Sequence, residues 1–371
     1  MVLAAQDRFS SAVDHFRIMR TAARADRGIG RSIMPFMQKR TIGIASTLAG
    51  AALWGFSGTC SQFLLESYAI SSLFITMVRM LGAGALFIAL IAVRYRAQAR
   101  GILADRRARR RLLLFGIAGL YLCQLTYVIA IGYTNAGTAT VMQSLNIVMI
   151  MIASCMLARR LPRRPEVAGL VLAIVATAVI ATQGDLGTLS LSGAALFWGF
   201  ATAATAAAYS MLSTPLSRGW GSFVTTGLGM FAGGVAGAAV WIAAFFVPGI
   251  DTVASAGNAM GTALIPQLDV AGVAVLAVIV AVGTFAAFFL YLHGIALVGA
   301  VQGSQLGAIE PVSATVCSAV LVGTSFSSWD WIGLALMVGT ILLVAAGKGD
   351  VSKIDAPEPA ISAGEYGSDE A

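Results

Sequence analysis

Two charged residues lie deep inside apolar stretches of the sequence, and they are its strongest candidates for chemistry. Arg79 lies about nine residues into the apolar run 70–93, and Glu310 lies about seven residues into the run 303–324. An arginine at this depth in a membrane costs about 2.5–3.5 kcal/mol on insertion scales, so it should face the protein interior and have a partner. Arg79 and Glu310 therefore indicate either a ligand or ion site, or an ion pair that only locks helices together.

Pro311 directly follows Glu310 and should disturb the helix that contains both residues. Proline lacks a backbone donor and restricts the residue before it, so we expect a kink here whose freed carbonyls line a cavity. His293 lies near the end of the run 271–297, where a structural role at the membrane interface is ordinary.

Amide and aromatic side chains form a second group of candidates. Four amides lie at corresponding ends of two apolar runs, namely Gln143, Asn146, Gln302 and Gln305. They could bind a zwitterionic or polar ligand, or bridge neighbouring helices, which is typically worth about 0.6 kcal/mol each. The aromatic candidates for a pocket wall are Trp54, Trp198, Tyr127 and Tyr291, although most membrane aromatics pack against lipid or neighbours. The series Gly229, Gly233 and Gly237 predicts a helix face for close packing.

Other kinds of chemistry find little support in the sequence. The apolar runs contain no cluster of nucleophile, base or metal ligands, so an intramembrane enzyme is disfavoured. A phosphate loop of the Gly-x-x-x-x-Gly-Lys type is absent, which argues against a nucleotide-driven pump. Four cysteines at unrelated spacings, Cys60, Cys123, Cys155 and Cys317, suggest packed small side chains. We therefore predict no cofactor and no metal site.

The elements that position these residues are long apolar helices. Of all residues 58% are apolar and only 11% are charged, compared with roughly 25% charged in ordinary globular domains. Apolar runs of about 17 to 25 residues are long enough to cross about 30 Å of hydrocarbon. The predicted spans are 42–64, 70–93, 112–132, 138–157, 166–182, 191–213, 223–247, 271–297, 303–324 and 329–347. The expected fold is an all-α integral membrane protein with ten transmembrane helices.

Basic residues alternate between the predicted loops in a way that predicts orientation. Eight Lys and Arg residues lie in the N-terminal tail and eight in residues 94–111, with more in 158–165. Loops such as 183–190 and 248–270 contain none and carry acidic residues instead. Basic loops collect on the cytoplasmic side, so both termini should be cytoplasmic and the acidic loops external. The net charge of +7 is explained by orientation and anionic lipid, and does not indicate nucleic acid.

Five segments follow from this pattern. They are a basic cytoplasmic tail (1–41), a first five-helix repeat (42–182), an outer linker (183–190), a second five-helix repeat (191–347) and a disordered cytoplasmic tail (348–371). The sequence from Gly50 to Phe56 returns with one inserted residue as Gly193 to Phe200, which supports the division into repeats. Because each repeat has an odd number of helices, the second must be inverted, an architecture typical of secondary transporters.

These residues resemble those of the drug/metabolite transporter superfamily, in particular its EamA-type ten-helix members. The resemblance covers about residues 42–347 and is carried by Trp54-Gly55, Val78-Arg79-Met80 and Glu310-Pro311-Val312. Gly169 and Gly333, early in the fifth and tenth predicted helices, also match the glycine that usually follows the end of the preceding helix in the family. The chain departs from the family at two positions. In helix four, Ser144-Leu145-Asn146 stands where the family usually has a proline, and after helix nine the common glutamate is replaced near Gly323-Thr324.

The resemblance implies transport, often export, of metabolites such as amino acids across the cytoplasmic membrane. With the residues, it predicts alternating access around a site of Arg79, Glu310, Asn146, Gln143, Gln305, Trp54 and Trp198. The expected partners are a small-molecule substrate and membrane lipid, with protons as a candidate coupling ion. A non-transporting membrane scaffold or receptor is the main alternative. No feature of the sequence indicates an oligomeric state.

Overall fold

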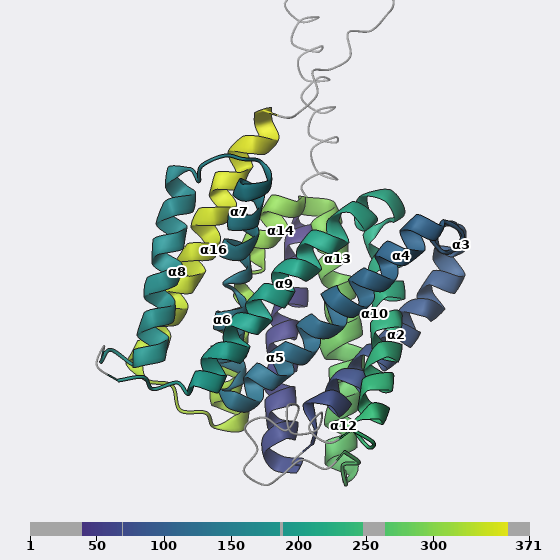
Figure 1. Cartoon of the computed structure of the whole chain (residues 1–371), viewed down its shortest axis with the longest axis horizontal. Helices are drawn as coiled ribbons and strands as arrows, with labels where there is room; N and C mark the ends of the chain where they lie inside the picture. The colour runs from purple at the N-terminus through teal and green to yellow at the C-terminus, as the bar shows by residue number, and fades with distance from the viewer. Residues whose placement is uncertain (1–38, 69, 186–187, 248–263, 355–371) are drawn as a thin grey trace, which may run out of the picture.

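The protein is a bundle of long helices. The computed structural model describes residues 39–68, 70–185, 188–247 and 264–354 (Figure 1). Within these ranges eight helical segments are long and apolar enough to cross a membrane: Ser72–Arg94, Arg106–Tyr133, Ala136–Leu157, Arg164–Thr182, Gly193–Trp220, Ser222–Ala243, Val270–Val298 and Gln302–Val322. Each of these covers most or all of one predicted span. The first predicted span lies in a helix of residues 39–68, and the last largely coincides with a shorter apolar helix, Ser328–Val344. The all-helical membrane class is confirmed, and ten spans stay a prediction.

Several of the long segments are divided into consecutive elements. After the helix of residues 39–68, the order is α2 (Ser72–Arg94), α3 (Arg96–Ala104), α4 (Arg106–Leu114), η1 (Phe115–Tyr121), α5 (Leu122–Tyr133), α6 (Ala136–Gln143), α7 (Asn146–Leu157), α8 (Arg164–Thr182), α9 (Gly193–Trp220), α10 (Ser222–Ala243), α12 (Val270–Val278), η2 (Ile279–Ala286), α13 (Ala287–Val298), α14 (Ala300–Leu306), α15 (Ile309–Cys317), η3 (Ser318–Val322) and α16 (Ser328–Ile354). The η elements are π-helical turns inside longer helices. Such turns are frequent at functional sites.

Two helices are interrupted at the level where the candidate residues lie. The first interruption, at Ser144 and Leu145, separates α6 from α7. The second, at Gly307 and Ala308, separates α14 from α15. The kink expected at Pro311 therefore lies a few residues earlier, and Pro311 occupies the first turn of α15, where a missing N–H costs no helical hydrogen bond.

Close packing of α10 against α2 and η1 depends on glycine. A Cβ on Gly234 would lie 2.8 Å from the backbone nitrogen of Leu81, and a Cβ on Gly233 would overlap the carbonyl oxygen of Gly116. Gly229 and Gly237 are equally crowded, by Phe115 and Tyr121. The predicted small-residue face of 229, 233 and 237 is confirmed, since only glycine lets these backbones approach so closely.

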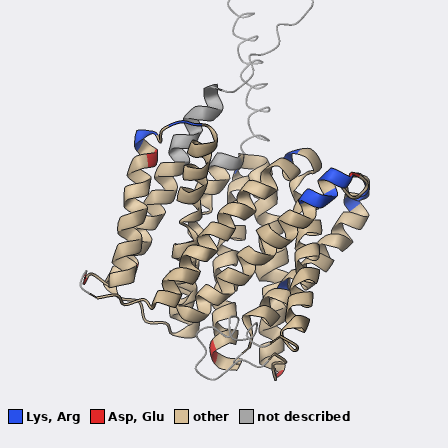
Figure 2. Cartoon of the chain, viewed as in Figure 1, with Lys and Arg blue, Asp and Glu red and all other residues tan. Residues whose placement is uncertain are grey.

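Basic residues gather mainly at one end of the bundle, whereas acidic residues lie at both ends (Figure 2). Lys and Arg gather at the end formed by α3, α4 and the start of α8, which we call the basic end. Asp269 and Asp330, which begin α12 and α16, lie at the opposite, acidic end. The two ends of the described chain, residues 39 and 354, both lie at the basic end (Figure 1). Most of the predicted outer loop 248–270 falls outside the described residues.

Candidate functional site

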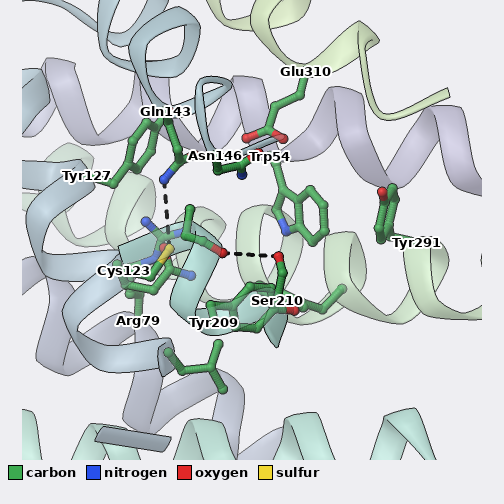
Figure 3. A pocket seen from close by; sticks show the side chains of 14 residues that line it. Trp54, Arg79, Cys123, Tyr127, Gln143, Asn146, Tyr209, Ser210, Tyr291 and Glu310 are labelled. Carbon is green, nitrogen blue, oxygen red and sulfur yellow. Dashed lines mark hydrogen bonds between the residues drawn. The ribbon is translucent and has the colours of Figure 1, made fainter. Parts of the chain in front are cut away.

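A cavity of about 230 Å³ lies at the centre of the bundle (Figure 3). Its lining comes from nine elements and consists of Trp54, Arg79, Leu120, Cys123, Gln124, Tyr127, Gln143, Asn146, Ala206, Tyr209, Ser210, Phe288, Tyr291 and Glu310. Helices α8, α10 and α16 contribute no residue to this lining. The wall combines aromatic rings, amides and one residue of each charge, so it suits a small molecule with both apolar and polar parts.

Arg79 reaches the cavity from α2 and is only 2% exposed. Its Nε donates to the hydroxyl of Thr284 at 3.3 Å, and its Nη2 donates to the hydroxyl of Ser57 at 3.4 Å. The third nitrogen, Nη1, is buried and has no partner among the described residues. The prediction that Arg79 faces the protein interior is therefore confirmed, but its partners are hydroxyl groups and not a carboxylate.

Glu310 lines the same cavity from the first turn of α15. Within the described ranges its carboxylate forms no salt bridge, and the one salt bridge there joins Arg160 to Glu166 at 2.8 Å. Figure 3 shows Glu310 and Arg79 on different sides of the cavity, so they do not form a helix-locking ion pair. Opposite charges in one cavity, each without a charged partner in contact, are available to a ligand that carries charges of its own.

The amides Gln143 and Asn146 lie on either side of the α6–α7 interruption and line the cavity. Gln143 donates from Nε2 to the hydroxyl of Thr202 at 2.9 Å, which links α6 to α9. Asn146 begins α7 just as Glu310 lies at the beginning of α15, so each interrupted helix places one polar side chain in the cavity.

Three residues of interest lie outside the lining. Gln305 is half-buried in α14. The ring centroid of Trp198 lies 5.2 Å from that of Phe197, and Trp198 also packs against a core cluster that includes residues of the first helix, α5 and α6. His293 stacks on Phe289 with ring centroids 6.3 Å apart. The structure thus brings together Arg79, Glu310, Asn146, Gln143 and Trp54, but not Gln305 or Trp198.

Sequence reasoning missed several residues of the site. Gln124, Tyr209 and Ser210 line the cavity, while Ser57 and Thr284 hold Arg79. Ser57 lies three positions after Trp54 in a helix, so helical spacing places both on one face. For Thr284 no comparable signal exists, because its contact with Arg79 joins residues that are distant in the chain.

Toward the acidic end, about two helical turns beyond Trp54, a hydrogen-bond network surrounds Gln62, which is 2% exposed. Its Oε1 accepts from the backbone N–H of Ala136 at 2.9 Å and from the hydroxyl of Ser318 at 2.6 Å. Its Nε2 donates to Glu66 at 2.7 Å and to Thr324 at 2.9 Å. These bonds connect the first helix with the start of α6, the start of η3 and the residue Thr324 that follows η3, and they satisfy the amide completely.

Nearer the acidic end, the Tyr68 hydroxyl donates to Asp269 at 2.6 Å and adds a contact between the first helix and the start of α12. This hydrogen bond holds the pKa of Asp269 below its ordinary value. The carboxylate therefore stays charged at neutral pH and continues to accept from Tyr68.

Toward the basic end, a second depression continues from the cavity. It lies between α7 and α9, and its lining shares Ser210 with the central cavity and reaches Arg218 near the end of α9. Ser154 of α7 and Thr214 of α9 add hydroxyl groups to it. The central cavity therefore has a hydrogen-bond network toward the acidic end and an adjoining depression toward the basic end.

Apolar helices of membrane length surround a cavity lined by polar and aromatic side chains. This architecture is typical of a polytopic membrane protein that binds or transports a small molecule. The sequence matches the EamA-like transporter family over residues 41–182 and 193–346. The chain belongs to this family and is a membrane transporter.

Two individual proteins are similar to this chain, the first in sequence and the second in fold. An uncharacterized inner membrane transporter, YicL, of Salmonella typhimurium (strain LT2) is 32% identical over 305 residues, which cover 82% of this chain and 95% of that protein. A crystal structure 20% identical in sequence superposes with a TM-score of 0.54, covering 83% of this chain and 98% of the other. This second similarity concerns the fold alone.

Proposed function

We propose that this protein is a secondary transporter that exports small metabolites such as amino acids from the cytoplasm by alternating access. In this proposal ten helices form two inverted five-helix repeats, residues 42–182 and 191–347, joined by the outer linker 183–190. The family match supports the division, because its two segments have nearly the same bounds. The tails, residues 1–41 and 348–371, are not part of the transport cycle.

The observation that carries the proposal is the central cavity, which both halves line. Trp54 and Arg79 come from the first half, and Tyr291 and Glu310 from the second. A ligand held between the halves would be released when they rock against each other, as in other transporters built from inverted repeats. The unpaired charges of Arg79 and Glu310 suit the carboxylate and the ammonium of an amino acid.

The asymmetry of the cavity supports alternating access. In this proposal the Gln62 network closes the acidic end, while the α7–α9 depression adjoins the cavity on the side of the basic end. Because basic residues collect on the cytoplasmic side of a membrane, this conformation opens inward, and opening outward requires the Gln62 network to separate. Both termini are then cytoplasmic, and the protein resides in the inner membrane, as the name of its Salmonella relative states for that protein.

Glu310 is the residue we assign to proton coupling. It is the one acidic residue in the cavity lining, and within the described ranges no cation contacts it. A carboxylate in such a position can take up a proton when ligand leaves and release it when ligand binds. Export would then be driven by protons that enter in exchange.

Transport by purified protein in liposomes tests the proposal directly. Each of the twenty common amino acids, radiolabelled, is supplied to proteoliposomes with an imposed pH gradient. We expect gradient-dependent accumulation of at least one, reduced about tenfold or more by Arg79→Gln, since a charged hydrogen bond contributes roughly 1.5–3 kcal/mol. Arg94→Gln, on the same helix but exposed and outside the cavity, should transport normally. A chain that inserts and folds but moves no compound of this panel would instead support the scaffold or receptor alternative.

A further inference from the structure

The guanidinium of Arg79 is held in one orientation by hydroxyl groups from two other helices. Thr284, in η2, donates its own hydrogen to the carbonyl of Ile279 at 2.8 Å. Because that hydrogen is used, the Thr284 oxygen faces Arg79 Nε as an acceptor, at 3.3 Å. Ser57, in the first helix, accepts from Nη2 at 3.4 Å. Both partners are neutral, so the positive charge of Arg79 is oriented but not neutralised.

Ser57 is itself confined by close packing. A Cβ placed on Gly283 would overlap the Ser57 side chain, so the first helix approaches η2 closely only because residue 283 is glycine. The Ser57 hydroxyl is thereby kept between η2 and Arg79. Nε and Nη2 of the guanidinium thus donate to protein oxygens, whereas Nη1 has no partner among the described residues.

We propose that Arg79 Nη1 is the anion subsite of the cavity, which binds the carboxylate of the transported molecule, and that Ser57 and Thr284 are its positioning residues. This inference rests on the proposed transport function and adds which chemical group binds where. A buried N–H of a charged group without an acceptor is costly, and a carboxylate supplies the strongest acceptor available to it.

Two further observations favour an anion at this position. Trp54 Nε1 is also buried, has no partner in the described part of the chain and belongs to a residue of the same lining, so a second donor is available to an acceptor-rich group. The depression toward the basic end contains Arg218 and no acidic residue in its lining, which favours the entry of anions. Glu310 lies on another side of the cavity and would repel a carboxylate, so a ligand carboxylate is favoured beside Arg79 and disfavoured beside Glu310.

Three compounds with one carbon skeleton test the subsite: L-leucine, the corresponding acid 4-methylpentanoate and the corresponding amine 3-methylbutylamine. Binding to the purified full-length protein is measured by isothermal titration calorimetry. We expect the two carboxylates to bind about tenfold or more tightly than the amine, because only they can pair with Arg79. Equal or tighter binding of the amine, or binding of none of the three, would overturn the subsite.

The positioning role is tested with serine variants of the first helix. Ser57→Ala should weaken both carboxylates about three- to tenfold and leave the amine unchanged, because it frees the guanidinium to turn. Ser61→Ala is the matched control: Ser61 is buried one turn away, bonds only to the carbonyl of Ser57 at 2.9 Å and lies outside the cavity lining. Equal weakening of all three compounds by Ser57→Ala would indicate a merely structural effect and overturn the positioning role.

The same titrations separate this inference from the proposed function. If 4-methylpentanoate binds and neither L-leucine in this assay nor any amino acid of the liposome panel is accepted, the anion subsite stands and amino acids are the wrong substrate class. If amino acids are transported in liposomes but carboxylates have no advantage over the amine in binding, the transport function stands and the subsite is wrong.

Discussion

Arg79 and Glu310 share one cavity without touching, and this decides between the readings that the sequence left open. A structural ion pair would require direct contact, because only a close partner offsets the loss of hydration of two buried charges. Arg79 instead relies on Ser57 and Thr284, and Glu310 has no charged partner within the described ranges. Neither residue is therefore held by an ion pair, and the proposed function assigns each its own role, Arg79 toward a ligand and Glu310 toward a proton.

Replacing Glu310 by glutamine tests its role in coupling. We expect Glu310→Gln to insert and fold normally, because the amide has nearly the same shape and removes an unpaired charge. Transport driven by a pH gradient should fall at least about tenfold, while exchange of substrate across liposomes at equal pH should persist.

Protein abundance provides the complementary measurement. Because the structure has no Arg79–Glu310 contact, the double variant Arg79→Gln/Glu310→Gln should not be more abundant than Glu310→Gln alone. Rescue of abundance by the double change would show that the pair locks the helices after all. Full gradient-driven transport by Glu310→Gln would rule out the coupling role.

Interrupted helices and glycine faces determine the arrangement at the scale of elements. The α6–α7 and α14–α15 interruptions deliver Asn146 and Glu310 to the cavity, and the Gln62 amide connects three elements at the acidic end. In a membrane, helices associate through close packing and hydrogen bonds, because lipid offers no hydrophobic driving force between them. Such contacts can exchange between two arrangements during a transport cycle.

Breaking the Gln62 network should open the cavity toward the acidic end. Cys123 lines the cavity, so a variant that retains it as the only cysteine reports access by its reaction with an impermeant thiol reagent. With reagent at the acidic end alone, Gln62→Leu should raise the labelling rate several-fold, since leucine replaces none of the four hydrogen bonds.

A second glutamine at the same end supplies the control. Gln183 bonds to Asp330 at 2.7 Å and connects the ends of α8 and α16, which do not line the cavity. Gln183→Leu should leave the labelling of Cys123 unchanged. An equal effect of both changes would indicate general loosening and not a gate at Gln62.

Packing between η1 and α10 predicts a strong effect of a single methyl group. In Gly233→Ala the new Cβ would overlap the carbonyl of Gly116, and overpacking of this kind costs about 1–3 kcal/mol. We expect a lower unfolding temperature in detergent. Gly219→Ala, in α9 with nothing within 4 Å of the new atom, should unfold at or slightly above the original temperature. Equal stability of both variants would contradict the packing argument.

The whole molecule is organised by its two oppositely charged ends. Arginines of α3, α4 and α8 lie at one end, and Asp269 and Asp330 lie at the other (Figure 2). If the basic end faces the cytoplasm, the acidic end and the polar closure around Gln62 face outward.

Single cysteines test this orientation in a background without native cysteines. Ala104→Cys, at the end of α3, should react with an impermeant thiol reagent in inside-out vesicles but not in intact spheroplasts. Ser190→Cys, in the loop before α9 at the acidic end, should show the opposite pattern. Labelling of Ala104→Cys in intact spheroplasts would reverse the orientation and with it the proposed direction of opening.

Composition and charge pattern by themselves determined the membrane class, the approximate helices and their separation into basic and acidic ends. They could do so because hydrocarbon imposes length and polarity on every crossing segment, whatever its neighbours are. Arg79 and Glu310 were identifiable for the same reason, since an ionisable residue deep in a span needs a protein environment.

Only the tertiary structure decided which of these residues meet. Trp198 and Gln305 have the same residue types as Trp54 and Gln143, yet they lie outside the cavity lining because helix rotation, set by packing, places them elsewhere. Ser57, Thr284 and Gln62 act through partners distant in sequence, at separations that no helical period encodes. Local sequence therefore specifies which helices form, whereas the contacts between them select the residues that make a site.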